Sequence, residues 1–179
     1  VGGGYIAVEF AGILNGLGAD VTVIIRADNI LRGFDQTMRD ALCDEMRKKG
    51  IKVMAECQVQ SIEKIETGYS LRLDQVDFIE TDLVMYATGR APNTKGIGLE
   101  EAGVKLSSNG AIIVDEFSQT SVDSIYAIGD VIDRVQLTPV ALAEGMALVR
   151  TLYEGKPTSM SYENIASAVF SQPPIGSVG

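Results

Sequence analysis

The first seven residues, Val1-Gly2-Gly3-Gly4-Tyr5-Ile6-Ala7, constrain the fold more than any other part of the chain. They form a G-x-G-x-x-A turn between the end of a strand and an apolar helical pattern, and such a turn holds a pyrophosphate at a helix N-terminus. Gly2 permits the tight turn, Gly4 lets the backbone approach the phosphates, and Ala7 keeps the helix close to the strand. The turn predicts a Rossmann-like βαβ unit.

The segments after the turn agree with this prediction. Residues 5–17 have apolar side chains at helical spacing, and Gly18 follows as a C-terminal stop. Residues 21–25 form a continuous β-branched run, which is typical of a strand buried on both faces. A glycine pattern alone is weak evidence, but its strand–turn–helix–strand context makes the prediction of a dinucleotide site specific.

The rest of the first half predicts a helix, two strands and a hairpin. Asp35 is the expected cap of a helix at 37–49, and strands follow at 51–54 and 82–87. Residues 59–73 alternate apolar and polar side chains around Thr67-Gly68, as in a hairpin. We therefore expect an α/β fold in which a β-meander is inserted before the last strand of the nucleotide-binding domain.

The second half predicts three further strands and one helix. The strands are expected at 110–114, 124–130 and 165–170. A helix is expected at 138–153, with Thr138 as its cap and Pro139 in its first turn.

The residues after the second strand decide which nicotinamide cofactor fits the turn. An NAD site places an acid there, whereas this chain has Ile25 and Arg26, with Arg32 one loop later. A guanidinium matches phosphate geometry, so the two arginines favour the 2′-phosphate of NADPH. Asp28 lies two residues beyond the strand end, and we do not interpret it as an NAD-type acid.

Composition excludes several classes of function. The net charge of −9 disfavours nucleic acid and anionic membrane surfaces as partners, and no apolar run reaches the length of a membrane span. The chain has no histidine, so it offers no imidazole base, and we expect no metal site. Cys43 and Cys57 lie in no motif; they indicate core or surface thiols in a reducing, cytoplasmic setting, with an organelle as the alternative.

Six separated segments carry a family resemblance. They are GGGYIAVEFAG (2–12), ILRGFD (30–35), ATGRAPNT (87–94), IYAIGD (125–130), LTPVA (137–141) and FSQPPIG (170–176). In this order they resemble the FAD-dependent pyridine-nucleotide disulfide oxidoreductases, and within that family the glutathione reductase group. The resemblance implies that NADPH and FAD are the cofactors, that glutathione disulfide is the substrate and that the enzyme is a homodimer.

The resemblance also implies a domain plan. Residues 1–92 match the NADPH-binding domain, 93–163 the returning half of the FAD-binding domain, and 164–179 the start of the dimerisation domain. Because the chain has no initiator Met, no C-x-x-x-x-C motif and no His, we expect it to be an internal piece of a longer protein. The redox-active cysteines would precede residue 1, and a His-Glu pair would follow residue 179.

The resemblance assigns roles to further residues. Tyr5 and Glu9 match the gate at the flavin and the acid beside the nicotinamide, and they lie one helical turn apart. Gly89 and Arg90 match residues that border the NADPH site.

On the flavin side, Asp130 matches the aspartate that binds the FAD ribityl chain. Thr138 begins the helix whose positive end faces the flavin pyrimidine ring.

Three alternatives stay open from the sequence. A trypanothione reductase shares the 31–35 and 168–171 segments, and substrate-binding residues elsewhere would separate the two. A dihydrolipoamide dehydrogenase fits less well, since it should have an acid in place of Ile25 and lack the arginines. A dinucleotide-binding module without disulfide chemistry would lack the cysteine pair.

Overall fold

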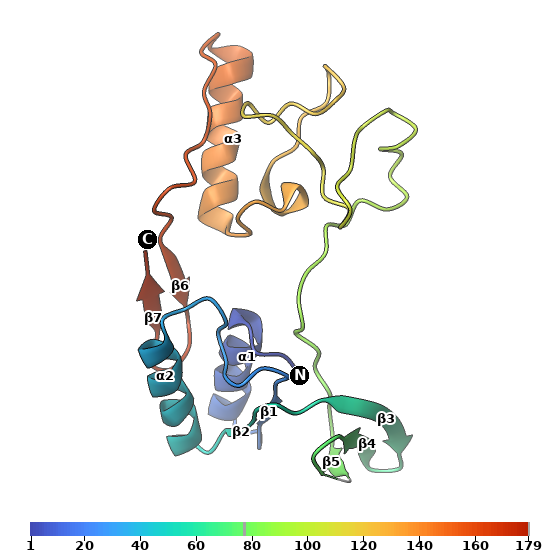
Figure 1. Ribbon diagram of the computed structural model, residues 1–179, viewed down its shortest axis with the longest axis vertical. Coiled ribbons are helices and arrows are strands. Elements are labelled where there is room, and N and C mark those ends of the chain that lie inside the picture. The colour runs from blue at the N-terminus through green and yellow to red at the C-terminus, as the bar shows by residue number, and fades with distance from the viewer. Residues whose placement is uncertain (77, 179) are drawn as a thin grey trace. The chain divides into compact units, whose positions relative to one another are not determined.

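The computed structural model describes residues 1–76 and 78–178 and shows two compact units (Figure 1). One unit contains residues 1–89 and 166–178, and the other contains residues 90–165. Each unit has apolar clusters of its own. The domain plan drawn from the family resemblance stays a prediction, although residues 166–178 do pack in the same unit as the glycine turn.

The first unit begins with the predicted βαβ arrangement. Helix α1 (Tyr5–Gly16) leads to strand β1 (Thr22–Ile24), and helix α2 (Gln36–Lys48) leads to strand β2 (Lys52–Met54). The two strands pair in parallel, with Val23 opposite Val53. Asp35 caps α2 as expected, because its carboxylate accepts a hydrogen bond from the backbone N–H of Met38 at 3.2 Å.

The main core of this unit joins the two helices to β1 and the C-terminal hairpin. Its buried members recur at helical spacing in α1 and α2. Val23 and Ile25 also belong to it, whereas Ile24 between them packs in a second cluster, so this segment is buried on both faces as its β-branched run predicts. The buried members of the main core include Val8, Ala11, Val23, Ile25, Leu42, Met46 and Val169.

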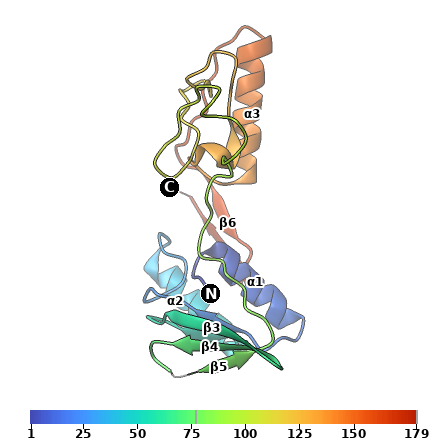
Figure 2. The ribbon, with the colours of Figure 1, turned by 90° about the vertical axis from the view of Figure 1, so that its right-hand side faces the viewer.

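The meander consists of three antiparallel strands (Figure 2). Strands β3 (Val59–Ile65) and β4 (Gly68–Leu73) confirm the predicted hairpin. Strand β5 (Ile79–Thr81) pairs with β4 and was not predicted, since three residues are too few to show an alternating pattern.

The strand predicted at 82–87 is wrong. Residues 82–87 form no strand, although two backbone hydrogen bonds link them to Val1. The N-terminal amine of Val1 donates to the Met85 carbonyl at 2.7 Å, and the N–H of Ala87 donates to the Val1 carbonyl at 2.8 Å. These two bonds still hold residues 82–87 beside the glycine turn.

The second unit contains less regular structure than the sequence predicts. The strands expected at 110–114 and 124–130 are wrong: isolated bridges join Leu106 to Ile112 and Gln119 to Tyr126, and neither bridge extends into a ladder. A 3-10 helix, η1 (Gly129–Ile132), takes the place of the second strand's end. Val104, Ile112, Ala127 and Ile132 form the core instead of a sheet.

Helix α3 (Thr138–Tyr153) confirms the predicted helix but corrects its cap. Leu137 is the N-cap, with an extended backbone, and its carbonyl accepts from the N–H groups of Val140 and Ala141. Thr138 is therefore the first helical residue and provides no side-chain cap.

Two short strands close the first unit. Strands β6 (Ser167–Val169) and β7 (Ile175–Ser177) form an antiparallel pair, so the strand predicted at 165–170 is present but shorter. In the described part of the chain, no helix is both long and apolar enough to cross a bilayer.

Gly2 has a backbone conformation and surroundings that only glycine tolerates. Its φ is +130°, and a Cβ built on it would collide with the carbonyl oxygen of Ala87. Gly4 differs, because its φ is −79° and a Cβ would meet no atom within 4 Å. The first glycine is thus required by the fold, and the fold places no such demand on the third.

We expect Gly2→Ala to lower the free energy of unfolding by about 2 kcal/mol or more, through backbone strain and the collision with Ala87. Gly4→Ala is the matched control and should cost about 1 kcal/mol or less, the range of a changed helix N-cap. Chemical denaturation followed by circular dichroism measures both. Equal losses in the two variants would contradict the assignment.

We expect the two cysteines to resist alkylation at neutral pH. Cys43 and Cys57 are 4% and 1% exposed, and burial raises the pKa of both thiols, so little reactive thiolate is present. Peptide-level mass spectrometry after iodoacetamide treatment should show labelling only when urea is added. Fast labelling of either peptide in the folded protein would show that its thiol is accessible.

Candidate functional site

The N-terminus of α1 offers free backbone donors beside an open surface. Gly4 is the N-cap, has no side chain to cap the helix, and no acid lies in the first turn. The first hydrogen bond of the helix runs from the Val8 N–H to the Gly4 carbonyl, at 3.1 Å. The N–H groups before Val8 are therefore available to an anion. The positive end of the helix dipole adds to this preference.

Three segments meet at this helix end. The N–H of Gly2 donates to the Ile24 carbonyl at the end of β1, at 3.0 Å. The N–H of Leu31 donates to the Gly3 carbonyl at 2.6 Å. Ile25 is 2% exposed and lies directly against Gly3, where a Cβ would come within 3.1 Å of its Cγ2 atom. The glycine turn, the strand end and the loop at 26–34 are therefore held in contact with one another.

The loop at 26–34 combines a buried centre with exposed cations. Ile30 and Leu31 are 0% and 1% exposed and belong to the main core of the first unit. Arg26 and Arg32 are exposed on either side of this buried pair. Among the described residues neither arginine forms an ion pair, so both guanidinium groups remain available to a phosphate.

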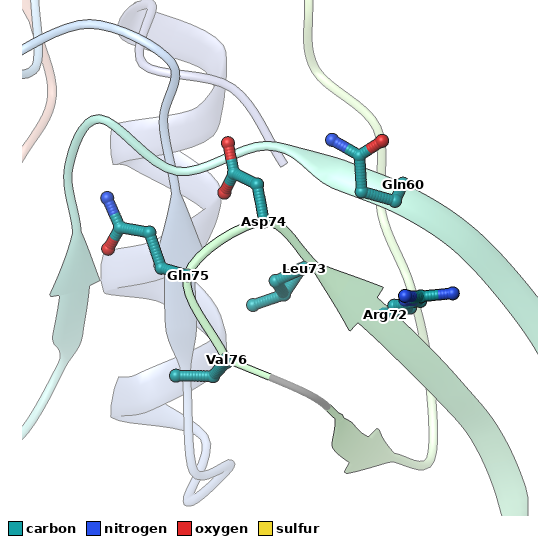
Figure 3. Close-up of a pocket in the computed structure, with 6 residues that line it drawn as sticks. All are labelled: Gln60, Arg72, Leu73, Asp74, Gln75 and Val76. Atoms are coloured by element: carbon teal, nitrogen blue, oxygen red, sulfur yellow. The ribbon is translucent and has the colours of Figure 1, made fainter.

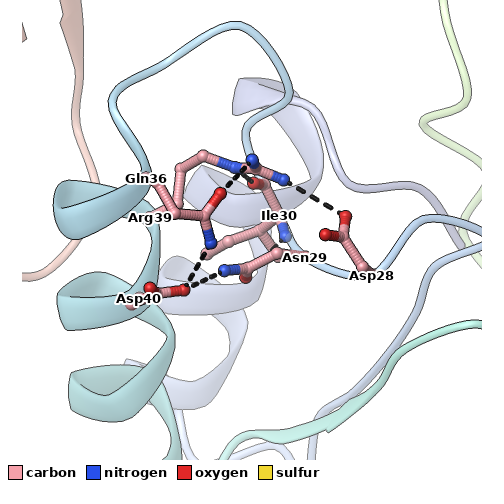
Figure 4. Close-up of polar contacts among 6 residues, drawn as sticks. All are labelled: Asp28, Asn29, Ile30, Gln36, Arg39 and Asp40. Carbon is pink, nitrogen blue, oxygen red and sulfur yellow. Dashed lines mark hydrogen bonds and ion pairs between the residues drawn. The ribbon is translucent and has the colours of Figure 1, made fainter.

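A polar network supports the loop from α2 (Figure 4). Arg39 donates through Nε to the Ile30 carbonyl at 2.7 Å, and Asp40 accepts from the side-chain amides of Asn29 at 2.6 Å and Gln36 at 2.8 Å. The sequence prediction missed this network. Its only sequence signal is the position of Arg39 and Asp40 one helical turn after the Asp35 cap, which does not distinguish Arg39 from other helical arginines.

Tyr5 and Glu9 lie on the first two turns of α1. The Tyr5 side chain is exposed, and a Glu9 carboxylate oxygen accepts a hydrogen bond from the backbone N–H of Phe170 at 2.8 Å. This bond connects α1 to the end of β6, a contact across 161 residues that sequence reasoning did not find. The gate and nicotinamide roles of the two residues stay predictions.

Gly89 and Arg90 follow the segment that is tied to Val1. Ala87 approaches Gly2 closely, so the chain reaches Gly89 next to the glycine turn. Gly89 is exposed and has a φ of +146°, and Arg90 is exposed. Ala7 is half-buried on the first turn of α1, and its packing role stays a prediction.

Asp130 and Thr138 lie on two neighbouring elements of the second unit. Asp130 lies in η1 and not at a strand end, and η1 packs on α3, where Gly129 faces Ala141. Both Asp130 and Thr138 are exposed. The structure therefore offers a carboxylate and an uncapped helix N-terminus on neighbouring elements.

A buried carboxylate holds η1 in place, and the sequence analysis missed it. Glu144 on α3 is 1% exposed; its oxygens accept from the Gly129 N–H at 2.6 Å and from the Tyr162 hydroxyl at 2.7 Å. Arg134 lies over the Tyr162 ring, 5.3 Å from the centroid. Burial raises the pKa of Tyr162, and Glu144 acts in the same direction while Arg134 opposes it.

A polar depression of 720 Å³ lies on the meander of the first unit (Figure 3). It is lined by Gln60, Arg72, Leu73, Asp74, Gln75 and Val76. Asp74 already accepts the N–H of Gln58 at 2.9 Å. Across the described ranges no group of three or more Cys, Asp and Glu could hold a metal.

The chain is similar to known disulfide reductases over its whole length. It is 50% identical to a glutathione reductase of Burkholderia cepacia, 53% to the chloroplastic/mitochondrial glutathione reductase of Pisum sativum and 45% to a trypanothione reductase of Trypanosoma congolense. Each alignment covers 100% of this chain but only 40%, 33% and 37% of the respective relative. The chain thus spans about two fifths or less of the length of these relatives.

A solved structure has the same fold. The HOCl-induced flavoprotein disulfide reductase RclA of Escherichia coli superposes with a TM-score of 0.93 at 30% identity, over 100% of this chain and 41% of that one. Residues 1–145 match the family described as pyridine nucleotide-disulphide oxidoreductase. The predicted α/β dinucleotide-binding fold and the predicted family are confirmed, and this chain belongs to the pyridine nucleotide-disulphide oxidoreductases.

Proposed function

We propose that residues 1–179 provide the NADPH-binding half and part of the flavin-binding wall of a longer enzyme that reduces glutathione disulfide. The observation that carries this proposal is the glycine turn bonded to a loop with two exposed, unpaired arginines. Its support is the identity of 50% and 53% to two glutathione reductases. A cytoplasmic homodimer is part of the same proposal.

The first unit fits NADPH through groups of opposite charge to the cofactor. The free N–H groups after Gly4 bind the pyrophosphate, and the space beside Gly4 admits it. Arg26 and Arg32 bind the 2′-phosphate through charge-assisted hydrogen bonds. The family resemblance implies that Gly89, the last residue of this unit before the second one begins, and Arg90 would border the same cofactor.

At the nicotinamide end, the family resemblance implies that Tyr5 would be the gate that lies against the flavin until nicotinamide displaces it. Glu9, whose carboxylate is held by the Phe170 N–H, would be the acid beside the nicotinamide.

The second unit fits FAD through Asp130 and the N-terminus of α3. Asp130 accepts hydrogen bonds from the ribityl hydroxyls. The uncapped helix at Thr138 presents its positive end to the flavin pyrimidine ring, which favours the negative charge of the reduced ring. Glu144 fixes the Gly129 backbone, and so the Asp130 position, through its bond to the Gly129 N–H.

When bound, NADPH supplies a hydride that FAD relays as an electron pair to a protein disulfide, so that NADPH, a proton and glutathione disulfide give NADP⁺ and two glutathiones. This chain's own cysteines are buried and far apart in sequence, and it has no histidine. The proposal therefore places the redox-active cysteine pair and the acid/base pair outside residues 1–179.

Trypanothione reduction is the second candidate function. A trypanothione reductase is 45% identical to the chain, and the NADPH and FAD residues named above serve either disulfide equally. Comparing turnover of the full-length protein with glutathione disulfide and with trypanothione disulfide separates the two.

We expect residues 1–179 by themselves to show no steady turnover with NADPH, FAD and glutathione disulfide, because the chain lacks a reactive cysteine pair and an imidazole acid. NADPH consumption recorded at 340 nm measures this. The full-length protein in the same assay is the positive control. Sustained oxidation by the isolated chain would overturn the assignment of the redox groups.

We expect Arg26→Met combined with Arg32→Leu to erase the preference for NADPH over NADH. Each charge-assisted contact to the 2′-phosphate contributes about 1.5–3 kcal/mol to binding. Losing both contacts should therefore weaken NADPH binding by about 100-fold or more, while NADH binding changes little. Fluorescence titration of both cofactors gives the ratio of dissociation constants. An unchanged ratio would contradict phosphate binding by these arginines.

A further inference from the structure

We propose that Arg39 is a positioning residue for cofactor selection, which holds the loop at 26–34 so that Arg26 and Arg32 reach the 2′-phosphate together. The inference rests on the proposed NADPH function. Arg39 itself lies on α2, and its side chain is only 12% exposed, which separates it from the two exposed arginines that would touch the phosphate.

Arg39 uses its guanidinium to join the loop to the helix (Figure 4). Its Nε donates to the Ile30 carbonyl at 2.7 Å, and a terminal nitrogen donates to the Gln36 side-chain oxygen at 2.6 Å. The other terminal nitrogen lies 3.5 Å from the Asp28 carboxylate. Only the arginine fork has donors on three nitrogens for three such acceptors, so lysine is not equivalent here.

The Ile30 carbonyl is half of a peptide group that is bonded on both sides. The same peptide group contains the Leu31 N–H, which donates to the Gly3 carbonyl at 2.6 Å. Because the peptide group is planar and rigid, fixing its carbonyl on α2 also fixes its N–H at the glycine turn. Arg39 thereby connects α2 to the segment that is proposed to hold the pyrophosphate.

The conformation at this peptide needs such support. Leu31 has a φ of +53°, which is uncommon for a residue with a side chain, and it is 1% exposed. Of its two neighbours in the chain, Ile30 is fully buried and Arg32 is exposed. The direction in which Arg32 leaves the core is therefore set by the Ile30–Leu31 peptide, and a change there moves Arg32.

Arg39 also offsets an unfavourable charge. Asp28 lies in sequence between the two phosphate-binding arginines, and its side chain is 74% exposed. A carboxylate in this place repels a phosphate, and the Arg39 charge weakens that repulsion. Solvent screens this contribution, so the hydrogen bond to Ile30 is the larger effect.

The test compares three variants in the full-length holoenzyme. Arg39→Gln removes the fork, Arg39→Lys keeps the charge without Nε, and Arg47→Gln is the control. Arg47 lies on the same helix and is 52% exposed, and among the residues that the structure describes its one ion pair is with Asp44 of that helix, at 3.4 Å. For each variant we would measure the dissociation constants of NADPH and NADH and the melting temperature. Hydrogen exchange of residues 27–34 is measured in the absence of nicotinamide cofactor.

Arg39→Gln should weaken NADPH binding by about tenfold, because the variant loses a hydrogen bond from a charged group that holds the loop. It should weaken NADH binding by less than about twofold, because NADH has no 2′-phosphate for the loop to reach. Exchange at 27–34 should become faster. The NADPH dissociation constant of Arg39→Lys should lie between those of Arg39→Gln and the unchanged protein. That of Arg47→Gln should equal the value for the unchanged protein. If Arg39→Gln does not fold, the same comparison of NADPH and NADH binding is made with Arg39→Lys.

Equal weakening of both cofactors would overturn the inference, because it would make Arg39 a general structural residue. An unchanged ratio of the NADPH and NADH dissociation constants in a folded Arg39 variant would also overturn it. The double variant Arg26→Met and Arg32→Leu is titrated alongside. If that variant keeps its preference for NADPH, the proposed function fails; if it loses the preference while Arg39 variants keep it, only the present inference fails.

Discussion

The hydrogen bond from the Leu31 N–H to the Gly3 carbonyl, at 2.6 Å, is the contact on which the candidate site depends. It joins the glycine turn to the loop that follows β1, and Ile25 fills the space beneath Gly3. In the proposed NADPH site, the groups that would bind the pyrophosphate and those that would bind the 2′-phosphate must be a fixed distance apart. This bond and the buried Ile30 and Leu31 side chains provide that fixed spacing.

Each unit positions its exposed functional groups through a buried or bonded partner. In the first unit, Arg39 and Asp40 support the loop that carries the arginines. In the second, Glu144 is buried and bonded to the Gly129 N–H beside Asp130. Buried polar groups of this kind are satisfied by hydrogen bonds and therefore restrict the backbone that they hold.

The sequence predicted best where a local pattern has a local cause. The three helices, the Asp35 cap and the hairpin at 59–73 agree with the structure to within about one residue at most ends, because apolar spacing, capping and turn chemistry act over a few residues. The strands predicted at 82–87, 110–114 and 124–130 are absent as assigned strands. Whether an apolar run becomes a strand depends on a partner with which it can pair, and that partner is not visible in the run itself.

By itself, the sequence determined the dinucleotide turn, the arginines after β1 and the family, since these depend on residue type and order along the chain. Tertiary structure decided which residues hold them: the Arg39 bond to Ile30, the Glu9 bond to Phe170 and the Glu144 bond to Gly129. These contacts join residues 9, 161 and 15 positions apart. Each arises from how the backbone folds back on itself, and no spacing rule along one helix or strand encodes it.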